Sequence, residues 1–396
     1  MFSAVNFNCE EENSMKHRKL ALIGALVLAA AMTTSAFAAE TLKIGLVCPI
    51  SGNSAIAGKY ITHGVDTAQA ELGGKVTAKD GTEYDLEFIY MDNEAQEDKT
   101  VNVFQKLIEE EEVIAIVGPD MSKCALAAGP IAQNAGCPVV ATFATNTAVT
   151  EVGDYIFRAC FIDPFQGEMA ANYIWGKGYK TTGIMYNNAD AYPTGLVDAF
   201  REVYEGLGGE IVAIEEYSGS DIKDYNVQLT KIASAEPEAL FLPNLLGELG
   251  LQIQQARSAG LTCPIVCGDS ADTPEVGEVA GEAVKGVGYV SAFSAESTAD
   301  AAVAFVEKYT ELNPDELPNS NAELAYEATM MVANAIENAD EVTRDGVRDA
   351  LAAIKDLELP SGKMTMAEDR NPIKGGVVME YDETGVSHFV EAVDAS

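Results

Sequence analysis

The sequence predicts an α/β fold with two doubly wound lobes, and three observations support this prediction. From Thr41 onward, apolar runs of strand length alternate with longer amphipathic stretches. The strand-length runs are nearly continuous in Val and Ile, which is typical of parallel strands covered by helices on both faces. The alternation occurs in two series of similar size, with no linker rich in Pro, Gly or Ser between them.

The first series carries strand and helix signals in regular succession. In the stretch 98–111, apolar residues fall at helical spacing and acidic residues lie on the opposite side. The predicted strands are 42–50, 84–93, 113–119 and 137–144. The predicted helices are 58–72, 98–111 and 122–134.

The second series repeats this rhythm and is followed by a different C-terminal region. Its predicted strands are 181–188, 209–217, 239–244 and 263–269, and its helices are 192–208, 225–236 and 247–260. A strand at 286–293 and helices at 299–312 and 321–338 follow. The region 362–393 is predicted to form short antiparallel strands, because apolar and polar residues alternate there.

The N-terminus has the features of a cleavable secretory signal peptide. A basic segment at 15–19 precedes an apolar run at 20–32 and the small-residue site Ala36-Phe37-Ala38. The apolar run is shorter than the roughly 20 residues that span a bilayer, which disfavours the alternative of a membrane anchor. We therefore expect residues 1–38 to be a leader, with Met15 as the true start. We also expect a periplasmic or otherwise extracytoplasmic protein without a lipid anchor, because no cysteine stands at the cleavage site.

The charge and cysteine content exclude some classes of function. A formal net charge of −37 repels phosphate backbones, so nucleic acid is an improbable partner. Six cysteines follow the leader and allow fifteen disulfide pairings, among which the sequence does not choose. Several lie inside apolar runs, which favours buried free thiols. The spacing of Cys263 and Cys267 does not match a zinc site.

The stretch from Gly118 to Asn146 places two hydroxyl groups where a ligand could bind. Ser122 stands at the predicted start of a helix, in an N-cap position, and Thr145 follows the next predicted strand. Ligands of open α/β sheets bind beyond the carboxyl ends of the strands, and free amide groups at a helix start favour an anion. A carboxylate fits this arrangement. The alternative is a plain N-cap and a loop threonine.

The same stretch resembles the signature of periplasmic leucine/isoleucine/valine-binding proteins, the type I solute-binding components of ABC transporters. The resemblance is carried by 118–119, 124–128, 130–133, 138–139 and 144–146. Further matching segments extend it over nearly the whole chain after the leader: 42–52, 157–167, 190–196, 228–232, 254–260 and 267–275.

This resemblance implies two α/β lobes joined by three hinge crossings, near 159–163, 288–291 and 360–363. One lobe would comprise 39–160 plus 290–361, and the other 161–289 plus 362–396. A free hydrophobic amino acid, branched-chain or aromatic, would be trapped between the lobes by hinge closure. The protein would then deliver it to the permease subunits of an ABC transporter in the membrane.

Ligand-binding roles follow from the resemblance, residue by residue. The hydroxyl and backbone groups around Ser122, Ala144 and Thr145 would hold the α-carboxylate, and Phe143 would face the same pocket. Tyr192 would close over the ligand from the second lobe. Asp269, with Asp272 in reserve, would receive the α-ammonium group, and Phe161 would wall the pocket.

Each of these residues also has a purely structural interpretation. Tyr192 could mark the entry to a helix, and the two aspartates could cap the segment that begins at Pro274. Phe143 and Phe161 could belong to the core.

Three departures from the family pattern concern the ligand side chain. Leu245-Leu246 stand where many relatives have two tyrosines, Ala57 replaces an aromatic residue, and Phe143 replaces a small one. They predict a reshaped pocket that is not strictly leucine-shaped.

Catalysis is not predicted. The sequence after the leader contains two histidines, His63 and His388, and neither stands in a nucleophile motif, a Walker loop or a dinucleotide fingerprint. We therefore predict a monomeric binding protein without cofactor or metal. The alternative function is a soluble amino-acid-sensing module for a signalling receptor, because receptor ectodomains share this fold.

Overall fold

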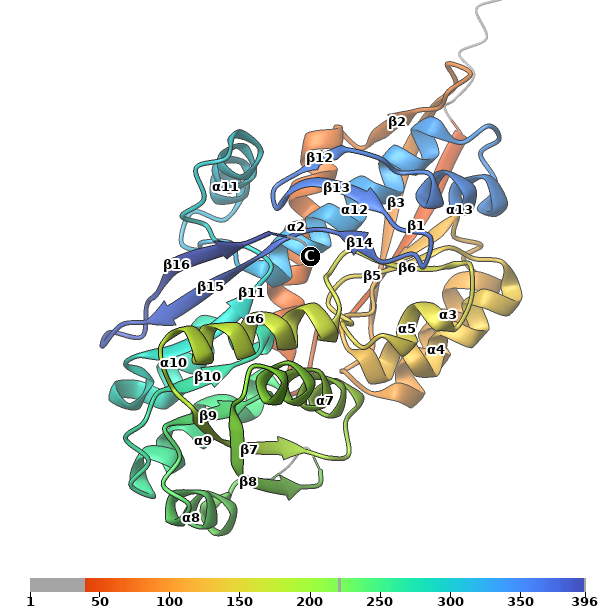
Figure 1. The fold of residues 1–396 in the computed structure, drawn as a ribbon. Coiled ribbons are helices and arrows are strands. Elements are labelled where there is room, and N and C mark those ends of the chain that lie inside the picture. Colours follow the sequence, from red (N-terminus) through yellow and green to blue (C-terminus); the bar gives the residue numbers. More distant parts are fainter. Residues whose placement is uncertain (1–39, 220–221, 395–396) are drawn as a thin grey trace, which may run out of the picture. The chain divides into compact units, whose positions relative to one another are not determined.

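Two open sheets form the framework of the protein, whose computed structural model describes residues 40–219 and 222–394 (Figure 1). The first sheet has the strand order β2-β3-β1-β4-β5-β6. Its strands are β1 (Glu40–Cys48), β2 (Lys75–Thr77), β3 (Glu83–Asp92), β4 (Ala115–Val117), β5 (Val139–Ala141) and β6 (Ile156–Arg158). β1, β4, β5 and β6 pair in parallel. The predicted leader and its start at Met15 lie outside the described residues.

The second sheet has the order β16-β15-β11-β10-β9-β7-β8. Its parallel strands are β7 (Thr181–Asn187), β8 (Glu210–Tyr217), β9 (Ala239–Leu242), β10 (Ile265–Cys267) and β11 (Val287–Ser291). The antiparallel strands β15 (Gly376–Tyr381) and β16 (Ser387–Val393) complete its edge, as predicted for the C-terminal region.

The two sheets share one winding pattern. In the first sheet the second strand of the series, β3, lies beside β1, and the chain then continues on the other side through β4, β5 and β6. In the second sheet β8, β7, β9, β10 and β11 repeat this order. The direction of winding therefore reverses between β1 and β4 and between β7 and β9, which are the places where doubly wound sheets bind ligands. The predicted α/β fold with two doubly wound lobes is confirmed.

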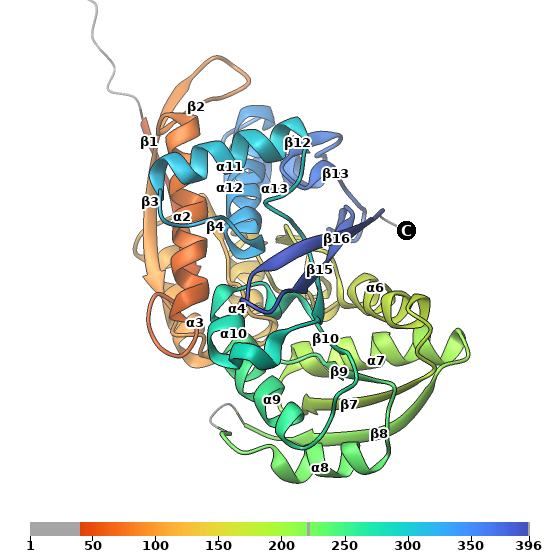
Figure 2. The ribbon, with the colours of Figure 1, turned by 90° about the vertical axis from the view of Figure 1, so that its left-hand side faces the viewer.

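Helices cover both faces of the first sheet (Figures 1 and 2). One face packs against α2 (Ala55–Leu72) and α12 (Ser320–Asn338) through Ile44, Leu46 and Val140. The other face packs against α3 (Glu97–Glu109) and α4 (Ser122–Ala135) through Val47, Ile116 and Val139. This alternation follows from the period of two along a strand. The helices α5 (Ala148–Glu151), α11 (Asp300–Leu312) and α13 (Arg344–Ala352) complete the lobe.

The second sheet is covered in the same way. The helices α6 (Asp163–Gly176) and α7 (Ala191–Gly206) pack against Ile184, Phe241 and Val266 on one face. The opposite face is covered by α8 (Asn226–Ser234), α9 (Leu246–Ser258) and α10 (Pro274–Ala280). The short 3-10 helices η1 (Asp269–Ala271) and η2 (Gly281–Val284) flank α10.

The chain passes between the two sheets three times. The first passage follows β6, and the second follows β11. The predicted crossing at 360–363 is wrong, because residues 360–361 form the turn between β12 (Leu357–Leu359) and β13 (Gly362–Met366) of a separate small sheet. The chain reaches the second sheet only after β14 (Pro372–Ile373). The lobe boundaries given above stay a prediction.

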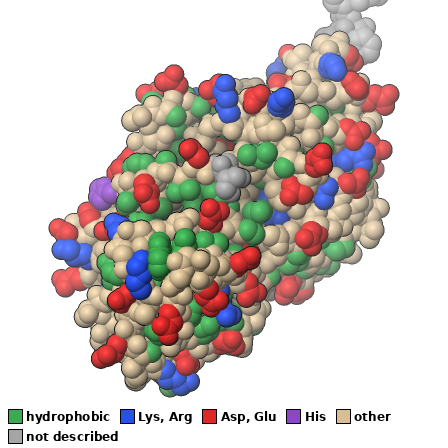
Figure 3. Space-filling view, viewed as in Figure 1, with side chains coloured by type: hydrophobic (Ala, Val, Ile, Leu, Met, Phe, Trp, Pro, Cys, Tyr) green, Lys and Arg blue, Asp and Glu red, His purple; other side chains and the backbone are tan. Residues whose placement is uncertain are grey.

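Most predicted elements are present, with ends that differ by a few residues. The strand β6 and the helices α6 and α13 were not predicted. All six cysteines of the described residues are free, and all except Cys263 are buried, as the sequence favoured. Among the described residues, no helix is both long and apolar enough to cross a membrane. On the face shown in Figure 3, acidic side chains are widely spread and outnumber basic ones.

The crossing of α2 and α12 depends on Gly64, because a Cβ at this position would collide with the backbone carbonyl of Ala322. We predict that Gly64→Ala lowers the free energy of unfolding by about 1–3 kcal/mol, as overpacking does. Gly206→Ala is the control, since Gly206 ends α7 with open space around it. A denaturant titration that shows no loss in Gly64→Ala relative to the control would contradict this packing.

Candidate functional site

A cavity lies between the two lobes. From the first lobe it is lined by Ala57, Asp120, Met121, Ser122, Phe143 and Asn321. From the second lobe it is lined by Asp190, Tyr192, Leu245, Leu246 and Ser270.

The lining comes from the carboxyl ends of the strands. In the first lobe, the segments that follow β1, β4 and β5 contribute Ala57, Asp120 to Ser122, and Phe143. In the second lobe, the segments after β7, β9 and β10 face them. The cavity therefore lies at both points where the winding reverses, which is where ligands bind in doubly wound folds.

Ser122 lines the cavity, but its predicted role as an N-cap is wrong. Met121 occupies the cap position and Ser122 is the first residue of α4. Its Oγ instead accepts a hydrogen bond of 3.2 Å from the backbone N–H of Asn146. Gly118, with a φ of 97°, allows the sharp turn from β4, since a Cβ there would collide with the carbonyl of Val47. No side chain caps the first turn of α4, and Met121 and Ser122 at this turn line the cavity.

The loop after β5 is held by Arg158, a buried residue that the sequence analysis missed. Its guanidinium donates to the carbonyls of Ala144 at 2.7 Å and Asn146 at 2.9 Å. The Thr145 carbonyl accepts a hydrogen bond from the N–H of Asp163, but its Oγ1 has no partner among the described residues. Ala144 and Thr145 are buried behind Phe143 and do not line the cavity. The FRAC sequence of 157–160 was the available signal for Arg158.

Tyr192 and Asp269 are brought together, as the sequence analysis expected of one site. The Tyr192 hydroxyl donates to Asp269 Oδ1 at 2.8 Å and lies 3.1 Å from Gln166 Oε1. Gly268 makes this approach possible, because a Cβ there would collide with the Tyr192 hydroxyl. Asp269 is buried directly behind Ser270, which lines the cavity.

Asp163 is a second buried carboxylate in this region and was not predicted as a site residue. Neither of its carboxylate oxygens has a hydrogen-bond partner among the described residues. Burial raises the pKa of Asp163 to about 7, although Thr145 and Arg158 oppose the rise. Burial raises the pKa of Asp269 to about 8, and the nearby Asp163 carboxylate adds to the rise. The site therefore contains two neighbouring carboxylates with too little positive charge around them.

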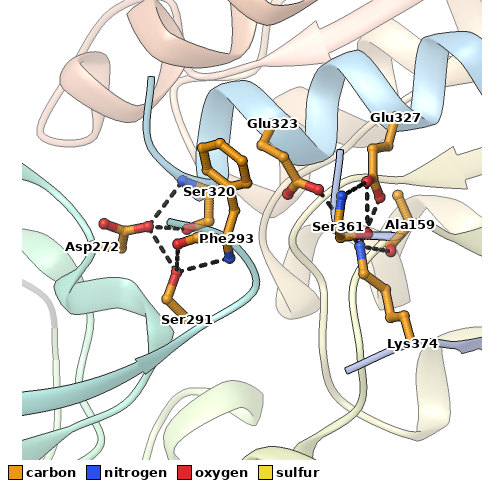
Figure 4. A network of polar contacts seen from close by, with 9 residues as sticks. All are labelled: Ala159, Asp272, Ser291, Phe293, Ser320, Glu323, Glu327, Ser361 and Lys374. Atoms are coloured by element: carbon orange, nitrogen blue, oxygen red, sulfur yellow. Dashed lines mark hydrogen bonds and ion pairs between the residues drawn. The ribbon is translucent and has the colours of Figure 1, made fainter. Parts of the chain in front are cut away.

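Asp272 has a different position from Asp269. Its carboxylate accepts hydrogen bonds from Tyr289, from Ser291, and from both the N–H and the hydroxyl of Ser320 (Figure 4). These bonds join the end of β11 to the start of α12. The carboxylate is fully engaged, and the residue does not line the cavity. The geometry therefore favours a structural role for Asp272 over a ligand-binding one. This role differs from the predicted one, because Asp272 does not cap the segment at Pro274.

The two phenylalanines predicted to contact the ligand lie in different places. Phe143 is partly buried and lines the cavity. Phe161 packs edge-on against Phe165, with 5.8 Å between the ring centroids, and belongs to the core. The four positions that depart from the family pattern, Ala57, Phe143, Leu245 and Leu246, all line the cavity.

A buried ionic cluster ties the crossings to α12 (Figure 4). Lys374, which lies between β14 and β15, donates to Glu327 Oε2 at 2.7 Å and to the Ala159 carbonyl at 3.2 Å. Glu327 Oε1 accepts from both the N–H and the hydroxyl of Ser361. Burial and the Glu327 carboxylate raise the pKa of Glu323 well above its usual range, although Lys374, whose Nζ lies 3.8 Å from Glu323 Oε1, opposes the rise.

Comparison with known proteins identifies the family. The model of the family described as periplasmic binding protein matches residues 41–386. The chain belongs to this family. It is 25% identical over 353 residues to a leucine-, isoleucine-, valine-, threonine- and alanine-binding protein of Pseudomonas aeruginosa, covering 89% of this chain and 92% of the relative.

Two solved structures have the same fold. A leucine-binding protein of Thermotoga maritima has a TM-score of 0.84 at 28% identity, covering 89% of this chain and 99% of that one. A branched-chain amino acid transporter substrate-binding protein of Streptococcus pneumoniae, in complex with isoleucine, has a TM-score of 0.81 at 31% identity, with the same coverage. The predicted membership of the type I, branched-chain amino acid group is confirmed. The family consists of solute-binding proteins.

The ionic cluster generates a prediction about stability. Replacing Lys374 by methionine leaves Glu327 buried without its cation, so we expect Lys374→Met to lower the free energy of unfolding by about 3–5 kcal/mol. Lys285→Met removes the exposed pair of Lys285 with Glu383 and should change it by at most about 1 kcal/mol. Denaturant titrations of both variants measure the difference. An equal loss of free energy of unfolding in both variants would mean that the buried cluster contributes no more to stability than an exposed ion pair.

Proposed function

We propose that this protein captures a free amino acid in the interlobe cavity and delivers it to the permease of an ABC transporter. The observation that carries the proposal is the pairing of an open helix start at Ser122 with the uncompensated carboxylates Asp163 and Asp269. An amino acid presents one negative and one positive group on the same carbon atom, and this site offers a complement for each. The names of the relatives support the same class of ligand.

The α-carboxylate would bind at the first turn of α4. The free N–H groups of a helix start carry a partial positive charge, which favours an anion. The Ser122 hydroxyl accepts from the Asn146 N–H, so its own proton can be donated to the ligand. The Thr145 hydroxyl lies close to Asp163 and favours the charged form by lowering the pKa of that carboxyl. Hydrogen bonds to a charged group contribute roughly 1.5–3 kcal/mol each.

The α-ammonium would bind near Asp269 and Asp163. Both carboxylates are almost completely buried, and an isolated buried charge is costly. An ammonium group placed near the two carboxylates would offset the free-energy cost of burying their negative charge. A ligand without an ammonium group would not offset this cost. Tyr192 positions Asp269 and closes the cavity from the second lobe.

The ligand side chain would be sorted by Ala57, Met121, Phe143, Leu245 and Leu246. These residues make the cavity predominantly apolar at this end. They suit a hydrophobic side chain, branched or aromatic. Hinge closure would be held by bonds between the lobes, such as Asn146 Nδ2 to the Ala191 carbonyl at 2.9 Å and the Lys123–Asp190 ion pair at 3.3 Å. Delivery to a permease places the protein outside the cytoplasm, in agreement with the predicted leader.

Ser122→Ala tests the carboxylate site. A thermal-shift screen of the wild-type protein against the common amino acids identifies the best ligand, because a ligand that binds only the native state raises the melting temperature. We expect Ser122→Ala to weaken the binding of this ligand by roughly 10- to 150-fold in calorimetry, the equivalent of one charge-assisted hydrogen bond. Ser258→Ala, on the exposed surface of α9, is the control. Unchanged affinity in Ser122→Ala would remove Ser122 from the site.

The pKa shifts predict how binding depends on pH. Burial raises the pKa of Asp269 to about 8 and of Asp163 to about 7, so both are partly protonated near neutral pH. A bound ammonium lowers these pKa values, and binding therefore releases protons. The affinity should rise between pH 6 and pH 8, by up to about tenfold per pH unit for each proton released. Calorimetric affinities that are flat or fall over this range would contradict the assignment of these carboxylates.

A further inference from the structure

One cavity-lining carboxylate has no place in the binding of the amino-acid head group. Asp120 lies between β4 and α4 and is 5% exposed. It lines the cavity, and its Oδ1 has no hydrogen-bond partner among the described residues. A buried carboxylate oxygen without a donor is costly, and its presence in a binding cavity points to a donor that arrives with the ligand.

The other charged residue of the cavity lining is already satisfied. Asp190 accepts a hydrogen bond from the N–H of Tyr192 through Oδ1 and pairs with Lys123 through Oδ2 at 3.3 Å. Asp120 has no ion pair among the described residues, although the backbone N–H groups of Asp120 and Met121, and to a smaller extent Lys123, favour its charged form and lower its pKa. Burial raises the pKa of Asp120 to about 6, so the carboxylate is mainly ionised at pH 7.

The topology places Asp120 at the end of the cavity that faces the ligand side chain. β4 lies between β1 and β5. On the β5 side, Ser122 contacts Asn146, and this is where the proposed head-group contacts lie. The β1 side carries Ala57, at the start of α2. Asp120 lines the cavity together with Ala57, Leu245 and Leu246, the residues assigned above to the ligand side chain.

We infer that Asp120 selects amino acids whose mainly apolar side chain carries a hydrogen-bond donor, a hydroxyl or an amine, and disfavours purely aliphatic or aromatic ones. This inference rests on the proposed function and specifies its substrate class. The surrounding residues Met121, Phe143, Leu245 and Leu246 accommodate the apolar part of the side chain. Asn321 lines the same cavity from α12, and its amide can donate to a hydroxyl oxygen but not to an ammonium group. A hydroxyl is therefore the favoured donor.

The magnitude of such selection can be large. A site built to hydrogen-bond a ligand hydroxyl rejects the analogue that lacks it more strongly than an apolar pocket distinguishes one methylene, because a buried polar group is left unpaired. Conversely, an apolar residue at position 120 would remove the unpaired carboxylate and favour the aliphatic analogue.

Matched ligand pairs test this inference by calorimetry on the full protein. The pairs are threonine with valine, tyrosine with phenylalanine, and lysine with norleucine. We expect the wild-type protein to bind the donor-bearing member of at least one pair at least about tenfold more tightly. In Asp120→Leu that preference should disappear or reverse, while the aliphatic or aromatic member binds as well as before or better. The control is Asp198→Leu on the exposed face of α7, which should keep the wild-type preference.

The possible outcomes separate this inference from the proposed function. No binding of any amino acid would overturn the proposed function, and the inference with it. Binding that favours the member without a donor in every pair would overturn the inference alone. A loss of all ligands in both Asp120→Leu and Asp120→Asn, with folding retained in circular dichroism, would assign Asp120 to the α-ammonium group and would also overturn the inference. A donor preference that survives in Asp120→Leu would have the same consequence.

Discussion

The burial of carboxylates without sufficient positive charge is the constraint on which the rest of the site depends. Asp163 and Asp269 lie where the carboxyl ends of two sheets meet, and each raises the cost of charging the other. Arg158 favours the charged form of Asp163, but burial outweighs it and raises the pKa of that carboxyl to about 7. The ammonium group of a zwitterionic ligand would add positive charge at this place. The buried carboxylates Asp163 and Asp269 thus lie with little compensating positive charge at the place where the two lobes meet.

Two other buried carboxylates have several partners within the protein. Asp272 accepts hydrogen bonds from three side chains and one backbone N–H, and Glu327 pairs with Lys374 (Figure 4). Both groups connect α12 to the chain segments that pass between the sheets. Complete polar networks of this kind specify one arrangement of the segments. Asp272 and Glu327 therefore have structural roles around the crossings, whereas Glu323 beside them has no hydrogen-bond partner among the described residues.

The sequence was sufficient to predict the two doubly wound lobes, because hydrophobic periodicity is a local signal that follows directly from strand and helix geometry. The short strand β6 and the helix α6 were missed, since the segment around Arg158 carries a buried charge that interrupts the apolar pattern. Ser122, Phe143 and Tyr192, which the sequence analysis predicted as ligand-binding residues, line one cavity. Sequence alone did not distinguish Asp269 from Asp272, nor reveal Asp163 and Asp120, because the distinction depends on hydrogen-bond partners that are distant in sequence.

The central claim is that the protein recognises an α-ammonium group through carboxylates that otherwise lack a cation. It is tested most directly by comparing the best amino-acid ligand with the same molecule lacking its α-amino group, by calorimetry at pH 7.5. This account predicts that the desamino acid binds at least about 100-fold more weakly, since it leaves Asp163 and Asp269 uncompensated. Affinities within a few-fold of each other would contradict the account and would indicate a receptor for simple carboxylic acids.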